Sequence, residues 1–94
     1  MKHLECEWDE AKNLANIQNH GISFIEAKSV FADEYALLIA DPDRSEVEDR
    51  FLLLGLSGKL RLLLVCHCFE VEERLIRIIS CRKASRKEMN KYQR

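Results

Sequence analysis

Arginine residues at three positions have the chemistry to bind a phosphate. Arg77 lies inside the apolar run 75–81, Arg82 follows that run directly, and Arg50 precedes the run 51–56. A guanidinium group stays charged, and its planar fork can donate two hydrogen bonds to one phosphate. An unpaired charge in an apolar strand is costly. We therefore expect Arg77 either to open onto a binding site or to pair with a carboxylate such as Glu48.

Positive charge gathers at the C-terminal end of the chain. Residues 1–73 hold 7 Lys and Arg against 15 Asp and Glu, whereas residues 74–94 hold 8 against 1. Arg82, Lys83 and Arg86 stand close together in this segment, where they can converge between a strand and a helix. Such a block can attract phosphates. The alternative is an ordinary solvated helix face.

Groups that could transfer a proton or stack on a base are fewer. His67 titrates near neutrality and is a candidate for proton transfer, although a lone histidine in a strand is more often a packed core group. Tyr92 could stack on a base or donate a proton, or pack the last helix onto the sheet. Lys12 and Arg61 are further cations, of which Arg61 is the lesser candidate.

The four cysteines do not predict a metal site. Cys66 and Cys68 flank His67, but no second pair with metal-ligand spacing accompanies them. The N-terminus turns acidic at once and lacks the apolar core of a secretory signal. We therefore expect reduced thiols, a cytoplasmic protein, no metal and no cofactor.

The N-terminal elements follow from the apolar pattern. Leu4, Cys6 and Trp8 alternate with acidic residues, which predicts a short strand. Asp9 can cap a helix that ends before Gly21, where glycine tolerates the left-handed conformation. Apolar residues recur at helical spacing between these two ends, at Ala11, Leu14, Ala15 and Ile17.

Two pairs of residues predict where further helices begin. Ser23 and Glu26 stand three apart, as Ser85 and Glu88 do, and this spacing is typical of a capping box. The first pair predicts a second short helix. The second pair predicts a helix from about residue 86 to the end of the chain.

Strands are expected between these helices. Apolar runs predict four of them, at residues 35–39, 51–56, 60–69 and 75–81. The acidic segment 41–49 is expected to be an exposed, mobile loop, and Ser57-Gly58-Lys59 has the size of a hairpin turn. With 94 residues, the chain is long enough for one domain, residues 1–94. Its predicted class is α+β in two layers: two N-terminal helices, an antiparallel meander and a C-terminal helix.

Several short blocks, taken together, resemble the BrnT toxin family. They are Trp8-Asp9-Glu10-Ala11-Lys12, Asn16 with His20-Gly21-Ile22-Ser23-Phe24, Glu26-Ala27, Val30-Phe31, Asp33, Glu48 with Arg50, Gly55, residues 76–84, and Glu88 with Tyr92. The blocks occur in the family's order and cover nearly the whole chain. Two departures stand out: Cys81 replaces a frequent alanine, and the insert 69–75 is unusually acidic for a surface that contacts RNA.

The resemblance implies a RelE-like fold and a ribonuclease that inhibits translation and growth without a metal. It implies neutralisation by a BrnA-type antitoxin whose ribbon-helix-helix part binds operator DNA, so that DNA is contacted only indirectly, and it allows a dimer within that complex. No membrane is involved. Arg50, Arg77, Arg82 and His67 become the catalytic candidates. The RNA-binding candidates are Lys12, Arg61, Lys83, Arg86 and Tyr92.

Two other functions remain open. The chain could be a protein-binding module, or a toxin without activity, that docks a DNA-binding antitoxin. It could also be a nucleic-acid-binding regulator without chemistry, although a basic tail with one aromatic residue offers little stacking surface. The register of the strands decides which candidate side chains meet, and the sequence does not fix that register.

Overall fold

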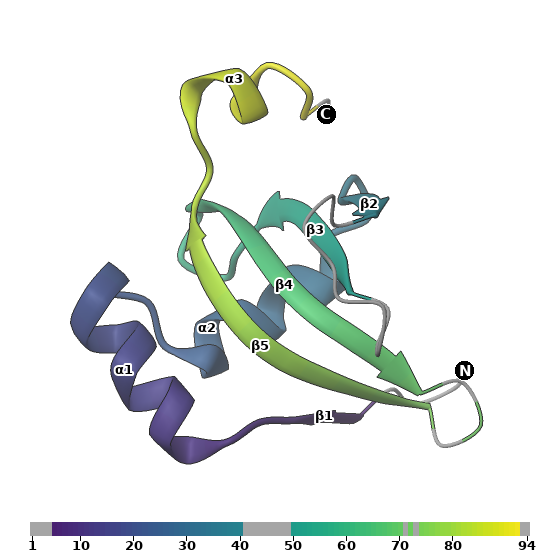
Figure 1. The fold of residues 1–94 in the computed structure, drawn as a ribbon. Helices are drawn as coiled ribbons and strands as arrows, with labels where there is room; N and C mark the ends of the chain where they lie inside the picture. The colour runs from purple at the N-terminus through teal and green to yellow at the C-terminus, as the bar shows by residue number, and fades with distance from the viewer. Residues whose placement is uncertain (1–4, 41–49, 71, 73, 93–94) are drawn as a thin grey trace.

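A five-stranded mixed sheet forms the centre of the molecule (Figure 1). The computed structural model describes residues 5–40, 50–70, 72 and 74–92. The elements in chain order are β1 (Glu5–Glu7), α1 (Glu10–His20), α2 (Phe24–Ser29), the short 3₁₀ helix η1 (Val30–Ala32), β2 (Leu37–Ala40), β3 (Phe51–Leu56), β4 (Leu62–Glu70), β5 (Leu75–Lys83) and α3 (Arg86–Met89). The predicted α+β class and order of elements are confirmed.

The strands are arranged in the order β1-β5-β4-β3-β2. Strands β2 to β5 form the predicted antiparallel meander, whereas β1 pairs with β5 in parallel and makes the sheet mixed. The strand expected at residues 35–39 begins two residues later, because Tyr35 lies in a turn. The predicted acidic loop at 41–49 and the pairing of Arg77 with Glu48 fall outside the described residues.

A β-bulge interrupts the pairing of β4 with β5. Cys66 is opposite Ser80, but the next residue, His67, is opposite Ile78, so Ile79 is skipped in the register. One extra residue in a strand reverses which face each following side chain occupies. Arg77 and Arg82, an odd and an even position, therefore share one face of the sheet.

Helix α1 begins and ends as its sequence predicts. The Asp9 carboxylate accepts a hydrogen bond from the Ala11 N–H at 2.8 Å, and Gly21 ends the helix with a φ of 71°. Its buried face differs from the apolar pattern, since Leu14 and Ile17 are 58% and 41% exposed. The buried residues of α1 are polar instead, and they are Asn13 and Asn16.

The two predicted capping boxes have different outcomes. The box at Ser85 and Glu88 is complete, although α3 is a single turn ending at Met89 and does not continue to the chain end. At α2 the Ser23 hydroxyl accepts from the Glu26 N–H as expected. The Glu26 carboxylate does not return to the cap, because it is bound by Arg61 and Ser57.

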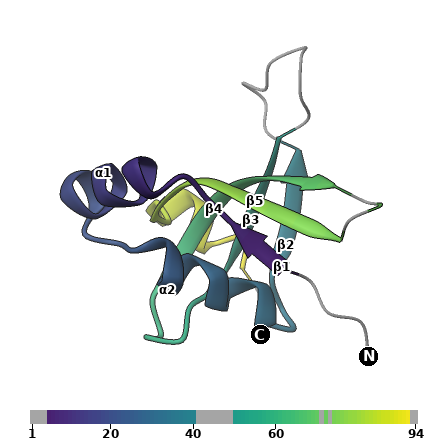
Figure 2. The same cartoon turned by 90° about the horizontal axis from the view of Figure 1, so that it is seen from below.

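Apolar side chains pack on both faces of the sheet. The larger cluster lies between the sheet and the segment that forms α2 and η1; its largest members include Ile22, Phe24, Leu63, Val65 and Ile78. Leu54, Leu64 and Ala84 form a smaller cluster on the opposite face, with Tyr92 packed against it. Figure 2 shows α2 along one side of the sheet and α1 beside the sheet at the level of β5. We call the face that bears the smaller cluster the outer face.

In the described residues, no helix combines the length and apolar character that a membrane crossing requires.

Candidate functional site

The outer face of β5 carries a row of exposed polar side chains. Arg77, Ser80 and Arg82 are all exposed, and they lie opposite Cys68, Cys66 and Leu64 of β4. Four residues of β4 separate the two ends of the row, which corresponds to about 13 Å along the strand. The bulge is what places both arginines in this row. Two of the three predicted catalytic arginines are therefore brought together on one accessible surface.

Arg77 lies in a cleft of about 320 Å³ at the edge of the sheet. Its Nε donates to Glu7 Oε2 at 2.9 Å, and its Nη2 lies 2.7 Å from the same oxygen. Lys12 lines the cleft from α1, and the bulged residue Ile79 lines it from β5; the other lining residues are Trp8, Asp9 and Ile78. The structure thus brings Arg77 and Lys12, two predicted site residues, to one concave surface.

Arg82 is held by the last helix. It donates two hydrogen bonds to the Glu88 carboxylate, at 2.9 and 2.8 Å, and one of these Glu88 oxygens also accepts from the Ser85 N–H. The Arg82 guanidinium, together with the Ser85 bond, lowers the pKa of Glu88 to about 2. Arg82 is still 45% exposed. Its position is therefore fixed while part of the side chain stays accessible.

The other predicted RNA-binding residues at this end differ in their environment. Lys83 and Arg86 are both exposed, but Lys83 is opposite Leu63 of β4 and therefore lies on the helix side of the sheet, whereas Arg82 lies on the outer face. Tyr92 donates a hydrogen bond to Asp33 and packs against the smaller cluster, which favours the packing role for this residue. Burial alone would raise the pKa of Asp33, but hydrogen bonds from Leu56, Tyr92 and Tyr35 outweigh it and lower the pKa.

Arg50 lies immediately before β3 and is half-buried. Phe51 pairs with His67 in the antiparallel register, so one further step places Arg50 opposite Cys68. Cys68 in turn pairs with Arg77. The order of strands therefore puts Arg50 and Arg77 at the same level of the sheet, two strands apart.

His67 occupies the opposite face. It is 4% exposed, its Nδ1 lies 3.2 Å from the Val65 carbonyl oxygen, and its ring makes an edge contact with Phe31 at 4.9 Å. It borders an apolar cavity of about 330 Å³, which Phe51 also lines. Burial lowers the pKa of His67 and keeps the ring neutral near pH 7. These surroundings favour the packed role that the sequence left open, and His67 does not converge with the arginine row.

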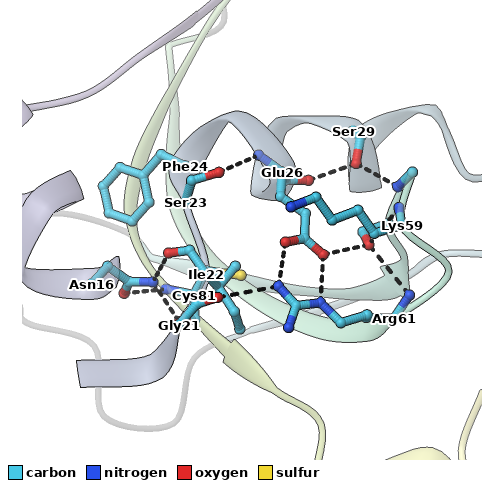
Figure 3. Close-up of polar contacts among 12 residues, drawn as sticks. Asn16, Gly21, Ile22, Ser23, Phe24, Glu26, Ser29, Lys59, Arg61 and Cys81 are labelled. Atoms are coloured by element: carbon cyan, nitrogen blue, oxygen red, sulfur yellow. Dashed lines mark hydrogen bonds and ion pairs between the residues drawn. The ribbon is translucent and has the colours of Figure 1, made fainter. Parts of the chain in front are cut away.

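Arg61 belongs to a network beneath the helices (Figure 3). Its guanidinium binds both oxygens of Glu26 and the Gly21 carbonyl, while the Ser57 hydroxyl donates to Glu26 at 2.7 Å. The Arg61 hydrogen bonds and the Ser57 bond lower the pKa of Glu26 despite its burial. This network joins α2 to the β3–β4 hairpin. RNA binding by Arg61 stays a prediction that these contacts do not favour.

Asn16 forms the second part of this network (Figure 3). Its amide nitrogen donates to the carbonyls of Ile22 and Cys81, both at 2.9 Å, and its Oδ1 accepts from the Cys81 N–H at 3.0 Å. Asn13 similarly accepts from the Phe24 N–H. Burial raises the pKa of the adjacent Cys81 thiol to about 12. The buried asparagines thus fasten α1 to β5 and to the start of α2.

One acidic residue of the cleft had no assigned role in the sequence. Glu7 alternates with Cys6 on a short strand and looks like an ordinary solvent-facing position. Its partner is Arg77, seventy residues further on. The parallel pairing of β1 with β5 brings the two together, and only a prediction of that pairing would have found Glu7.

The exposed sheet face of this small α+β domain carries two arginines, Arg77 and Arg82, whose guanidinium groups have the chemistry to bind phosphates. The model of a family described as the ribonuclease toxin BrnT of type II toxin–antitoxin systems matches residues 8–88. The chain belongs to this family.

A solved structure supports the fold. The chain is similar to the Brucella abortus ribonuclease toxin BrnT, solved at 1.1 Å, with 24% sequence identity and a TM-score of 0.65 over 89% of this chain and 100% of that one. A search of curated proteins found no match.

Proposed function

We propose that this ribonuclease toxin cleaves RNA without a metal ion and does so on the outer face of its sheet. The observation that carries the proposal is the bulge at Ile79, which places Arg77 and Arg82 on one exposed face and makes Ile79 a wall of the Arg77 cleft. Bulges are frequent beside active sites, where they redirect side chains.

In this proposal Arg77 stabilises the negative charge that develops on the phosphorane during cleavage. Fixed cationic donors are effective in this role because they need no reorganisation during the reaction. The Glu7 carboxylate holds the Arg77 guanidinium in place before the substrate arrives. Arg82 and Arg50 contact other phosphates of the same RNA molecule.

The remaining cations guide the RNA. Lys12 lines the Arg77 cleft, Arg86 is exposed and follows Arg82 closely in the chain, and Lys83 is exposed on the helix side of the end of β5. A line of cations of this kind binds backbone phosphates whatever the base sequence, and its affinity falls with salt. The outer face therefore supports a path for single-stranded RNA from Lys12 past Arg77 to Arg82 and Arg86.

The cellular consequences are part of the same proposal. Cleavage of cytoplasmic RNA stops translation and growth, and a BrnA-type antitoxin with a ribbon-helix-helix segment neutralises the toxin and binds operator DNA. The family assignment supports an antitoxin partner, since type II systems pair the toxin with one. Co-expression of this antitoxin should restore growth, and the purified complex should shift operator DNA while the toxin alone does not.

Cleavage by the purified chain tests the proposal directly. A fluorescent single-stranded RNA should be cut to fragments with 2′,3′-cyclic phosphate ends, and the rate should be unchanged by EDTA because protein cations supply the electrostatic stabilisation. Loss of cutting in EDTA that zinc restores would show that the reaction needs a metal. Expression without the antitoxin should arrest growth and fragment cellular RNA, and normal growth with intact RNA would contradict an active ribonuclease.

A further inference from the structure

The cleft around Arg77 contains a carboxylate with the position of a general base. Cleavage by the 2′-oxygen requires a group that removes the proton of the 2′-hydroxyl. His67 is buried on the opposite face of the sheet. Glu7 instead lines the Arg77 cleft, and its side chain is 42% exposed.

Glu7 has one carboxylate oxygen available for this task. Both contacts with Arg77 use Oε2, and Oε1 accepts no hydrogen bond from any described residue. Glu7 and Arg77 are direct partners in the parallel register of β1 and β5, so two backbones fix the position of the carboxylate. A base at Oε1 would lie within a few ångströms of the cation that stabilises the phosphorane.

The other acid of the cleft, Asp9, has a structural role, and no hydrogen bond or ion pair joins it to Arg77 among the contacts of the described residues. Asp9 Oδ1 accepts from the Ala11 N–H and caps α1, whose first turn depends on that bond. Lys12 lines the cleft from the next turn of the same helix. Glu7 contacts Arg77 of β5 and shares the cleft with a second cation, Lys12 of α1, and with the helix-capping acid Asp9.

We propose that Glu7 is the general base of the cleavage reaction and that Lys12 supplies the proton to the leaving group; this rests on the ribonuclease function proposed above. Glu7 removes the 2′-hydroxyl proton as the bond from the 2′-oxygen to phosphorus forms. Arg77 stabilises the charge on the phosphorane. The bond from phosphorus to the 5′-oxygen then breaks, and that oxygen takes a proton from the Lys12 ammonium group. The products are a 2′,3′-cyclic phosphate and a 5′-hydroxyl, and exchange with water restores both side chains.

Glu7→Gln tests the base while preserving the contact with Arg77, because the amide oxygen still accepts hydrogen bonds. Loss of a general base typically lowers the rate by about 10²- to 10⁴-fold. We expect a loss in this range in kcat, with KM changed less than threefold, and the disappearance of the acidic limb of the pH profile of kcat/KM. Glu5→Gln makes the same chemical change two residues earlier on β1, outside the cleft, and should cut RNA at the parental rate.

A substrate with sulfur in place of the bridging 5′-oxygen separates the base from the acid. The thiolate leaves without protonation, so Lys12→Ala should be slow on normal RNA and near the parental rate on the sulfur substrate. Glu7→Gln should be slow on both, because both need the 2′-proton removed.

The outcomes distinguish this inference from the function on which it rests. If Glu7→Gln cuts RNA at the parental rate and keeps the acidic limb of the pH profile, while Arg77→Ala does not cut, the assignment of Glu7 as the base is wrong and the proposed function stands. Glu7→Gln that recovers on the sulfur substrate overturns its role as base, and Lys12→Ala that stays slow there overturns the role of Lys12. A parental chain that cuts no RNA overturns both the inference and the proposed function.

Discussion

Two arginine–glutamate pairs on opposite faces of the sheet use the same chemistry in different surroundings. In the pair beneath the helices, the side chain of Glu26 is 3% exposed and that of Arg61 is 32% exposed. In the pair on the outer face, the corresponding values are 42% for Glu7 and 60% for Arg77. A buried pair cannot lose one member without leaving a costly charge, whereas an exposed pair contributes little to stability. Burial therefore separates the pair that maintains the fold from the pair that is available for a substrate.

The largest expected effect is on the fold, through Arg61→Ala. Among the described residues, the substitution leaves the Ser57 hydroxyl as the one side chain that donates a hydrogen bond to the buried Glu26 carboxylate. We expect the Tm, measured by circular dichroism, to fall by on the order of 10 °C or more. Arg77→Ala is the matched control and should change the Tm by only a few degrees, about what an exposed ion pair contributes. If Arg61→Ala has the parental Tm but no longer binds RNA, Arg61 belongs to the RNA site, which is the role that the sequence analysis allowed.

The next effect is on activity, through Arg77→Ala. Removing one electrostatic stabiliser of a transition state typically costs about 10²- to 10³-fold in rate. We expect this loss in single-turnover cleavage, with antitoxin binding retained. The exposure of the pair predicts that Arg77→Ala leaves the stability of the domain nearly unchanged. Arg77→Lys keeps the charge without the planar fork and should recover only part of the rate. If Arg77→Ala cleaves RNA at the parental rate, Arg77 and Glu7 do not belong to the catalytic site.

A smaller effect, on stability at acidic pH, is expected from the pair formed by Arg82 and Glu88. The pKa of Glu88 is about 2 in the folded chain against 4.5 in a model peptide. The stabilisation is therefore complete above pH 4.5 and is lost as the pH falls through about 2, and the exposure of the pair limits it to about 1 kcal/mol or less. An NMR titration of the Glu88 carboxyl carbon should give the low value, and Arg82→Ala should raise it. Ser85→Ala is the control that removes the hydroxyl cap and keeps the ion pair. A normal titration of Glu88 in the parental chain would show that α3 does not hold Arg82.

The helix boundaries and the meander were predictable because they depend on local signals. Asp9, Gly21 and Ser85 act on the backbone within a few residues of themselves, and their roles are confirmed. The buried face of α1 was not predictable, since the buried Asn13 and Asn16 make hydrogen bonds to backbone groups outside α1, those of Phe24 and Cys81. A search for apolar periodicity favours Leu14 and Ile17 for the buried face instead.

The candidate site was predictable as a set of residues but not as an arrangement. The arginines stood out because they lie within or directly beside apolar runs. Glu7 did not, because its role depends on a parallel pairing between the two ends of the chain. The bulge at Ile79 has no glycine and no charge that marks it in the sequence. This one skipped residue decides that Arg77 shares a face with Arg82 and does not share one with His67.

The smallest expected effect, and the sharpest test of the two faces, comes from His67→Phe. The ring lies among Phe31 and Phe51 beside an apolar cavity of about 330 Å³, so a phenyl ring has both room and suitable neighbours. The substitution loses the contact with the Val65 carbonyl, and similar apolar exchanges usually change stability by less than about 1.5 kcal/mol. We expect cleavage within threefold of the parental rate and an unchanged pH profile, because a neutral imidazole on the helix side cannot reach RNA bound on the outer face. If the cleavage rate falls a hundredfold while the Tm is unchanged, His67 is a catalytic group, which is the role that the sequence analysis allowed. RNA would then have to enter the apolar cavity, and the comparison between a structural face and a functional face would fail.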